Sequence, residues 1–288
     1  MKKFVAAAAM QALLVFFAAG AFCEKWTEYE ESLVGQVMQA RLESRMKKSD
    51  QEAGEWLLKK REEFFSSIDK EKVCEEAKLA YETMFALEQY HFMWEIDSKA
   101  KSTVDFAAAQ FNKVMDWNAA HPIASRNEWY AISAYEMINA YMPNLKYKQK
   151  ISLGLEEKKV YDSMVAAKCQ KGILYINAGL WYAFAPAIGG GSVKKAKDLL
   201  SVAAKIGPSG YEKFLGFVYL SQCDFILGDE ASCEKNLREA EKILPGNAYT
   251  PFVRRLNEAG IDAFEYADDK DAAIAKMNKF YGKKNEKK

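Results

Sequence analysis

The stretch from Ile173 to Asn247, ILYINAGLWYAFAPAIGGGSVKKAKDLLSVAAKIGPSGYEKFLGFVYLSQCDFILGDEASCEKNLREAEKILPGN, decides the fold of this 288-residue chain. It contains one spacing twice, as Ala196-x3-Leu200-x2-Ala203-x4-Pro208 and as Cys233-x3-Leu237-x2-Ala240-x4-Pro245. Positions three or four residues apart share one face of a helix, so both segments are predicted to be helices of the same design. Each follows another apolar segment with a small residue near its middle, Gly179 in the first and Ser221 in the second, where two helices can approach closely.

Helical spacing of apolar residues extends over almost the whole chain, and no alternating run bounded by turn residues competes with it. Breaks are predicted at 67–69, 97–99, 121–122, 142–143, 185–191, 207–208, 227–229 and 245–247. Capping boxes predict helix starts at Ser49, Ser125 and Ser209, and Thr250-Pro251 predicts another. The predicted fold is therefore all-α, an α-solenoid of antiparallel helix pairs.

The paired segments resemble the tetratricopeptide repeat, which alternates an aromatic-small-aromatic helix with an Ala-x3-Phe helix and a closing proline. The resemblance covers about a quarter of the chain, and Asp224 and Cys233 depart from the repeat pattern. It implies packing contacts at Gly179, Ala196, Ala203, Ser221, Cys233 and Ala240. It also implies an apolar concave groove formed by Ile173, Ile176, Leu180, Ala183, Phe184, Leu215, Val218, Gln222, Phe225 and Ile226. Either this groove is open to a partner or a terminal helix of the same chain fills it.

The first residues have the pattern of an export signal. Two lysines precede an apolar run from Phe4 to Phe22, and Ala19-Gly20-Ala21 suits a signal peptidase. We therefore expect a signal peptide at 1–22, a helical region with diverged repeats at 23–124, tetratricopeptide-like repeats and capping helices at 125–282, and a lysine-rich tail at 283–288. A membrane anchor is the alternative to cleavage, and lipidation of Cys23 is an alternative to a soluble periplasmic protein.

The residue types that usually carry catalysis are sparse. The chain contains only two histidines, His91 and His121, neither of which stands at metal-ligand spacing from a cysteine or carboxylate. Gly189-Gly190-Gly191 before Ser192 fits a flexible connector better than a phosphate loop. Charges are nearly balanced, with a formal net charge of +1, so no nucleic-acid footprint is indicated. Cys74, Cys169, Cys223 and Cys233 are expected to be buried thiols, although export would permit disulfides. No enzyme activity, cofactor or metal is expected.

Two functions remain open. The first is a non-catalytic periplasmic scaffold that binds a protein partner, or an amphipathic segment of one, in the concave groove, with weak salt dependence because apolar burial supplies the affinity. The second is a ligand-binding accessory, similar to the tetratricopeptide components of TRAP-type periplasmic solute transporters, that holds an apolar small molecule or an organic acid. Trp129, Tyr130, Trp181, Tyr182 and Phe184 are the aromatic residues that would line such a pocket.

Overall fold

The computed structural model of the chain describes residues 26–285. Within this range it contains thirteen α-helices, short 3-10 turns and no strand, which confirms the predicted all-α class. The helices are α2 (Glu28–Ser44), α3 (Asp50–Ser67), α4 (Glu75–Asp97), α5 (Lys101–Ala120), α6 (Glu128–Tyr141), α7 (Tyr147–Ala166), α8 (Gly172–Phe184), α9 (Val193–Ile206), α10 (Gly210–Ile226), α11 (Glu230–Ile243), α12 (Tyr249–Glu258), α13 (Ala263–Asp268) and α14 (Lys270–Asn285). The predicted signal peptide and Cys23 lie outside the described residues.

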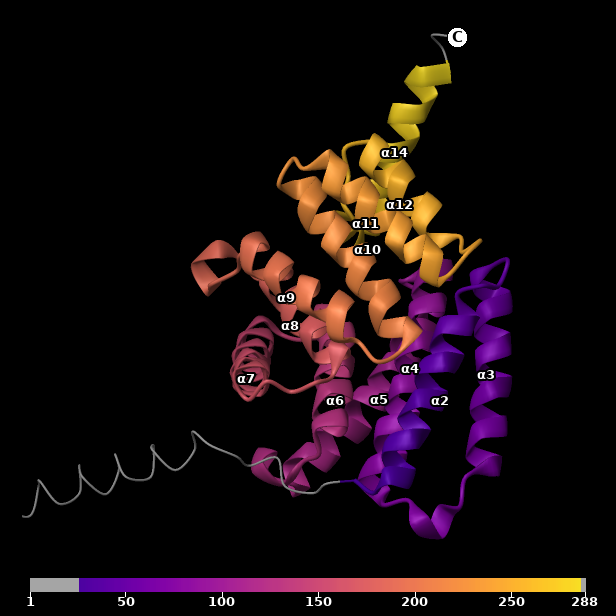
Figure 1. Cartoon of the computed structure of the whole chain (residues 1–288), viewed down its shortest axis with the longest axis vertical. Coiled ribbons are helices and arrows are strands. Elements are labelled where there is room, and N and C mark those ends of the chain that lie inside the picture. Colours follow the sequence, from indigo (N-terminus) through magenta and orange to yellow (C-terminus); the bar gives the residue numbers. More distant parts are fainter. Residues whose placement is uncertain (1–25, 286–288) are drawn as a thin grey trace, which may run out of the picture.

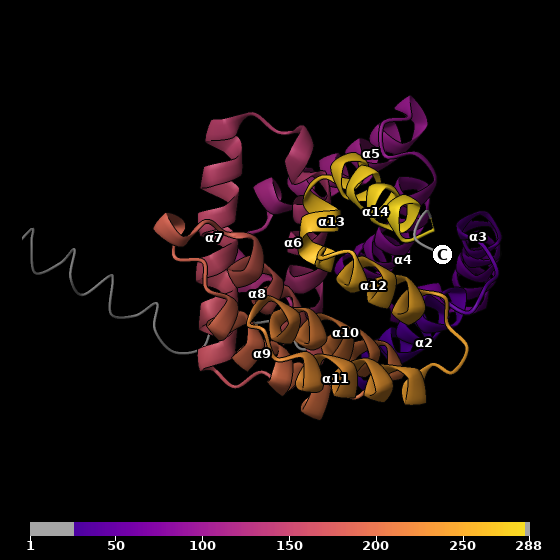
Figure 2. The same cartoon turned by 90° about the horizontal axis from the view of Figure 1, so that it is seen from above.

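Consecutive helices pack against one another, as expected of a solenoid-like array (Figures 1 and 2). Helices α8 to α11 form its most closely packed part. Helix α4 lies at the centre of the other half, with α2, α3, α5 and α6 packed around it. Residues 83–88 of α4 are all buried, which requires neighbours on every side of the helix. Because α10 also packs on α2 and α6 packs on α8, one core runs from Trp26 to Phe264.

The repeated spacing in α9 and α11 places small residues at the helix contacts. All six predicted packing residues are buried or in close contact, and a Cβ atom on Gly179 would lie only 2.8 Å from Leu200 Cγ. A closer approach between backbones occurs at Gly216, where a Cβ atom would lie 2.9 Å from the Ala204 nitrogen. Gly216 therefore allows the backbones of α9 and α10 to approach closely. Small residues permit this spacing because bulk at the same place would force the helices apart.

The helices end where the turn-forming residues predicted breaks, because each of the eight predicted breaks lies between two helices. Ser209 and Glu212 form the complete predicted capping box, whereas Ser49 accepts the Glu52 N–H without the reciprocal bond. At the third site the prediction was wrong, because Asn127 caps α6 while Ser125 lies in the preceding 3-10 turn. The side chain of Asn127 takes the N-cap role by accepting the Trp129 N–H at 2.8 Å.

The departure of Asp224 from the repeat pattern has a structural counterpart. Its buried carboxylate pairs with Lys197 of α9 at 2.6 Å and accepts from Asn236 of α11 at 2.7 Å. A charge-assisted contact thus replaces the expected aromatic packing between these helices.

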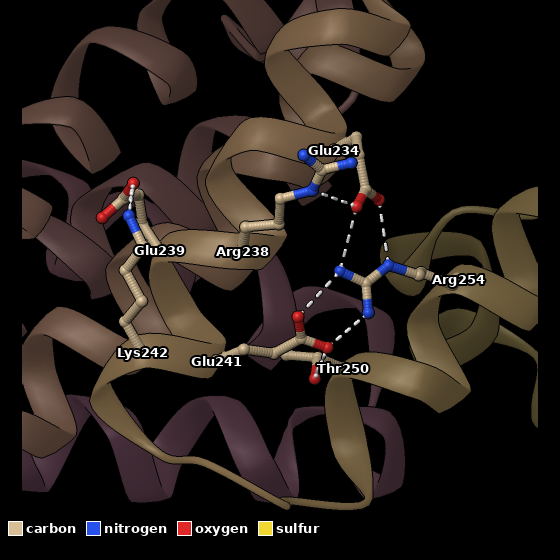
Figure 3. Close-up of polar contacts among 7 residues, drawn as sticks. All are labelled: Glu234, Arg238, Glu239, Glu241, Lys242, Thr250 and Arg254. Atoms are coloured by element: carbon tan, nitrogen blue, oxygen red, sulfur yellow. Dashed lines mark hydrogen bonds and ion pairs between the residues drawn. The ribbon is translucent and has the colours of Figure 1, made fainter.

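Figure 3 shows a second polar joint, between α11 and α12. The Arg254 guanidinium donates from Nε to Glu234 Oε2 at 2.9 Å and from Nη2 to Glu241 Oε2 at 3.0 Å. Thr250 Oγ1 donates to the same Glu241 carboxylate at 3.1 Å. These contacts hold the short α12 on α11. Helices α12, α13 and α14 then share a small core around Tyr266 and Met277, against which Trp94 of α4 packs.

Candidate functional site

An open groove runs along α4 between α3 and α5, and we call it the α3–α5 groove. Its wider part has a volume of about 710 Å³ and is lined by Arg61, Phe65, Ile68, Lys70, Glu75, Lys78, Leu79, Glu82, Lys113, Asp116, Trp117, Ala120 and His121. It continues into a narrower part of about 150 Å³, lined by Leu57, Leu58, Arg61, Glu82, Phe85, Ala86, Gln89, Phe106, Ala109, Gln110 and Lys113. The two parts share Arg61, Glu82 and Lys113, so they form one continuous surface.

The floor of the groove is one face of α4. Glu75, Leu79, Glu82, Ala86 and Gln89 recur every three or four residues and therefore lie along the same side of that helix. At 1.5 Å per residue this row spans about 21 Å. Helices α3 and α5 each pack against α4 and form the two walls, because each buries one face on α4 and leaves the other exposed.

An ionic bridge across the floor holds the walls in place. The Glu82 carboxylate accepts from Arg61 Nη2 of α3 at 3.2 Å and from Lys113 Nζ of α5 at 2.8 Å. All three side chains are partly exposed, so each pair contributes little to stability by itself. Their effect is on geometry, since the Glu82 carboxylate of α4 connects α3 and α5 at the middle of the groove.

The wide end of the groove is aromatic and cationic. The rings of Trp117 and His121 are stacked, with centroids 3.9 Å apart, and Trp117 Nε1 has no hydrogen-bond acceptor among the described residues. Lys78 pairs with Glu75 at 2.7 Å, whereas Lys70 makes no ion pair within the described part of the chain. The site can therefore take an occupant with an apolar face and polar edges.

The concave groove predicted on α8 and α10 is not open. Ile173, Ile176, Leu215, Val218 and Gln222 are buried in the core. Leu180, Ala183 and Phe225 are partly buried against that core, while Phe184 and Ile226 remain partly exposed. The alternative stated with the prediction holds, because a C-terminal helix of the same chain covers this face.

Helix α13 makes that contact with both helices of the pair. The Phe264 ring packs on Phe184 with centroids 5.5 Å apart and on Tyr219 at 6.1 Å. The Ala263 backbone N–H donates to Gln222 Oε1 at 2.9 Å. Helix α2 covers α10 on another side, where the Arg41 guanidinium lies 4.4 Å from the centre of the Tyr211 ring. The apolar face of α8 and α10 is thus covered by other helices of the same chain and is not exposed for a partner.

The aromatic residues predicted to line a solute pocket are not brought together in one. Trp129, Tyr130 and Tyr182 are buried, and none of the five lines the α3–α5 groove. Trp129 Nε1 instead donates to Glu31 at 2.9 Å, and Trp181 Nε1 donates to the Gly154 carbonyl at 2.9 Å. These rings join helices in the way that core aromatic residues usually do.

A buried ionic cluster joins α2, α4, α6 and α10. Glu88 forms an ion pair with Arg45, with 2.7 Å between Oε1 and Nε, and accepts a hydrogen bond from Arg41 Nε at 3.3 Å. Arg41 Nη2 also donates to Glu136 at 3.0 Å. Burial alone would raise the pKa of Glu88, but the two guanidinium groups outweigh it and hold the pKa at about 2. The cluster lines neither part of the α3–α5 groove, so we interpret it as a structural contact that holds these helices together.

His121 lines the α3–α5 groove, whereas His91 and the four described cysteines do not. Burial, assisted by Arg45, lowers the pKa of His91 to about 3, so its imidazole is neutral at physiological pH. Cys169, Cys223 and Cys233 are buried free thiols, as expected, and burial raises the pKa of each above its ordinary value. The expectation was wrong for Cys74, which is exposed because it stands at the N-cap of α4, where its Sγ accepts the Ala77 N–H at 3.4 Å. Among residues 26–285, no three His, Cys, Asp or Glu side chains are placed to hold a metal ion.

Sequence reasoning missed the α3–α5 groove, although a signal for it was present. The segment from Ala77 to Phe92 is apolar around nearly its whole circumference, which is typical of a central helix. Phe65 and Trp117 stand on the two helices that flank this one, and both line the groove.

Comparison of the chain with protein-family models, with curated proteins and with solved structures found no match. The fold and the groove themselves define the class, an all-α array of neighbouring helix pairs with an open groove on one side. No helix within residues 26–285 combines the length and apolar character needed to cross a bilayer.

Proposed function

We propose that this chain is an exported, tetratricopeptide-like helical repeat protein that binds an amphipathic helix of a protein partner in the α3–α5 groove, without catalysis or a cofactor. The observation that carries the proposal is the groove itself, an open surface with aromatic and aliphatic lining and charged rims. The site differs from the concave face expected of the repeat, because α13 occupies that face.

The dimensions of the groove support a helical occupant. Its floor extends for about 21 Å, which corresponds to roughly 14 residues of α-helix. Recognition of a helix in a groove works by inserting apolar residues at positions i, i+3 or i+4 and i+7 between two walls. Phe65, Leu79 and Trp117 in the wide part and Leu58 and Phe106 in the narrow part would receive such residues.

The charges of the groove support an interaction dominated by apolar contact. Glu82 is already satisfied by Arg61 and Lys113, and Lys78 is paired with Glu75. With most charges paired within the chain, little net charge remains to attract a partner over a distance. We therefore expect affinity that changes little with salt, whereas a steep loss of binding on adding salt would contradict this account.

Native mass spectrometry of the protein isolated gently from its own cell envelope tests the proposal, since one spectrum reports N-terminal processing, bound mass and stoichiometry. The structure supplies matched variants. Leu58→Arg places a charge in the narrow part of the groove, and Ile96→Arg makes the same kind of change at an exposed apolar residue that does not line it. A stoichiometric partner that is lost from Leu58→Arg and retained by Ile96→Arg supports groove binding. A partner that both variants retain refutes it.

A second candidate function is binding of a small apolar solute or organic acid by the same groove. The volume of about 710 Å³ in the wide part supports it, because small-molecule sites commonly lie between about 300 and 1,000 Å³. An added mass of a few hundred daltons that is lost on denaturation would favour this role over the scaffold.

A further inference from the structure

Helix α7 carries an apolar stripe on its outer face. Its inner face packs into the core through Val160, Tyr161 and Met164. On the opposite side the exposed fractions are 79% for Tyr147, 46% for Ile151 and 56% for Leu155. Because these three residues are spaced four apart, they form one continuous row along about two turns. Single exposed apolar residues are common on proteins, but an aligned row on one helix is not explained by folding alone.

The stripe lies on an outer edge of the molecule. Helix α7 and the α8–α9 connection occupy the same side in both views, and α3 lies on the opposite side (Figures 1 and 2). The connection carries Ile188, which is 100% exposed. Neither part of the α3–α5 groove includes any of these residues. The apolar side chains therefore lie on a projecting edge of the molecule. A projecting edge suits a broad, deformable partner surface better than a partner helix, which needs a groove.

Lysines surround this row. Lys146 at the N-cap of α7, Lys148 and Lys159 of α7 and Lys194 at the start of α9 are exposed and make no ion pair within residues 26–285. Three acidic side chains lie near these lysines. Asp162 pairs with Lys158 at 2.6 Å and with Lys195 at 3.6 Å, Glu156 accepts from Tyr135 Oη at 2.7 Å, and Asp198 is exposed on α9. The lysines outnumber these acidic side chains, so the edge combines apolar side chains with an excess of positive charge.

We propose that the α7 edge docks on an anionic lipid bilayer surface, with Tyr147, Ile151 and Leu155 entering the headgroup region and the lysines contacting lipid phosphates. A helix of this kind lies in the plane of the interface, where buried apolar side chains and attraction to anionic lipid act together. Docking through this edge leaves the α3–α5 groove facing away from the bilayer, so the inference does not depend on what occupies that groove.

A site-specific cross-linking experiment tests lipid contact directly. It uses the protein as it is isolated from cells, without truncation. A photo-cross-linking amino acid replaces Leu155 in one variant and Ile96, which is 57% exposed outside the edge, in another. Both are irradiated with phosphatidylcholine vesicles that contain about 30% phosphatidylglycerol. We expect lipid adducts at position 155 and none above background at position 96. The position-specific readout separates this edge from any membrane contact made elsewhere in the chain.

Flotation with the same vesicles provides the second measurement. Ile151→Ser/Leu155→Ser should reduce vesicle binding at the α7 edge by about tenfold, because each exposed apolar side chain contributes separately to interfacial binding. Met46→Ser/Ile96→Ser changes residues of matching exposure, 43% and 57%, and should leave binding unchanged. Unaltered circular dichroism melting would establish that both double variants fold.

Two results would overturn the inference. One is equal vesicle binding by the two double variants together with no lipid adduct at position 155. The other is cross-linking of position 155 in native envelopes to one acidic protein and not to lipid, which would assign the edge to a protein partner.

Discussion

The Glu157 carboxyl group should make the stability of this protein depend on pH. Glu157 of α7 is 0% exposed, and Asn139 Nδ2 of α6 donates a hydrogen bond to its Oε1. Burial raises its pKa from 4.5 to about 8. The folded protein therefore keeps this proton at neutral pH while the unfolded chain releases it, so stability is highest below pH 4.5 and falls as pH rises toward 8.

The size of the effect follows from the two pKa values. Each pH unit between them corresponds to about 1.4 kcal/mol, and the loss levels off near the folded pKa. Between pH 6.5 and 8 this gives a loss of about 1.6 kcal/mol in the free energy of unfolding. His91 acts in the opposite sense, because its folded pKa is lowered from 6.5 to about 3. The unfolded chain still binds part of a proton at this histidine at pH 6.5, so His91 offsets about 0.4 kcal/mol of the loss in this window. The difference between the parent protein and a variant that lacks the Glu157 carboxyl group therefore isolates the carboxyl contribution.

Urea denaturation at these two pH values measures the effect. Glu157→Gln keeps the acceptor for Asn139 but cannot ionise, so it should remove about 1.6 kcal/mol from the pH dependence. Glu62→Gln, at an exposed position on α3, is the matched control and should behave like the parent protein. If the parent and both variants lose the same stability between pH 6.5 and 8, the assignment of a neutral buried carboxyl group is refuted.

Two further changes test the packing. Gly179→Leu should destabilise the protein by about 1–3 kcal/mol or more, because even its Cβ would lie 2.8 Å from Leu200 Cγ, and a melting temperature equal to the parent's would disprove this contact. Gly35→Leu serves as its control, since no atom lies within 4 Å of a Cβ at that exposed helical position. Glu88→Gln removes the negative charge that pairs with both Arg41 and Arg45. It should lower the free energy of unfolding, measured by chemical denaturation, by about 3–5 kcal/mol. A cost below about 1 kcal/mol would show that other groups neutralise them.

Local chemistry explains how much of the helix pattern the sequence could predict. Glycine and proline at 185–191, 207–208 and 245–247 end helices for reasons that do not depend on tertiary contacts. The break between α7 and α8 was missed because residues 167–171 contain neither glycine nor proline, nor the serine and aspartate that marked the breaks at 67–69 and 97–99. There Lys168 adopts a left-handed conformation with φ of 57°, and Cys169 N–H closes the end of α7 by donating to Met164 at 3.2 Å.

Local patterns could not determine which exposed face would become a site. The apolar rows on α8 and α10 were correctly placed on helices, but whether they stay open depends on α13, some forty residues further along the chain in contact with Gln222. Similarly, the α3–α5 groove exists because two helices flank a third without covering its outer side. The side-chain period of a helix indicates that a face is apolar and says nothing about which element will cover it.

The sequence by itself thus determined the all-α class, the helix boundaries set by glycine and proline, and the close-packed spacing around Gly179 and Ala203. Tertiary structure alone decided that α13 fills the predicted concave face, that Glu82 joins three helices in a groove, and that Glu157 is buried deeply enough to stay protonated. The physical reason is range. Backbone preferences and helix periodicity act over a few residues, whereas burial, desolvation and ionic pairing depend on which distant segments the fold brings together.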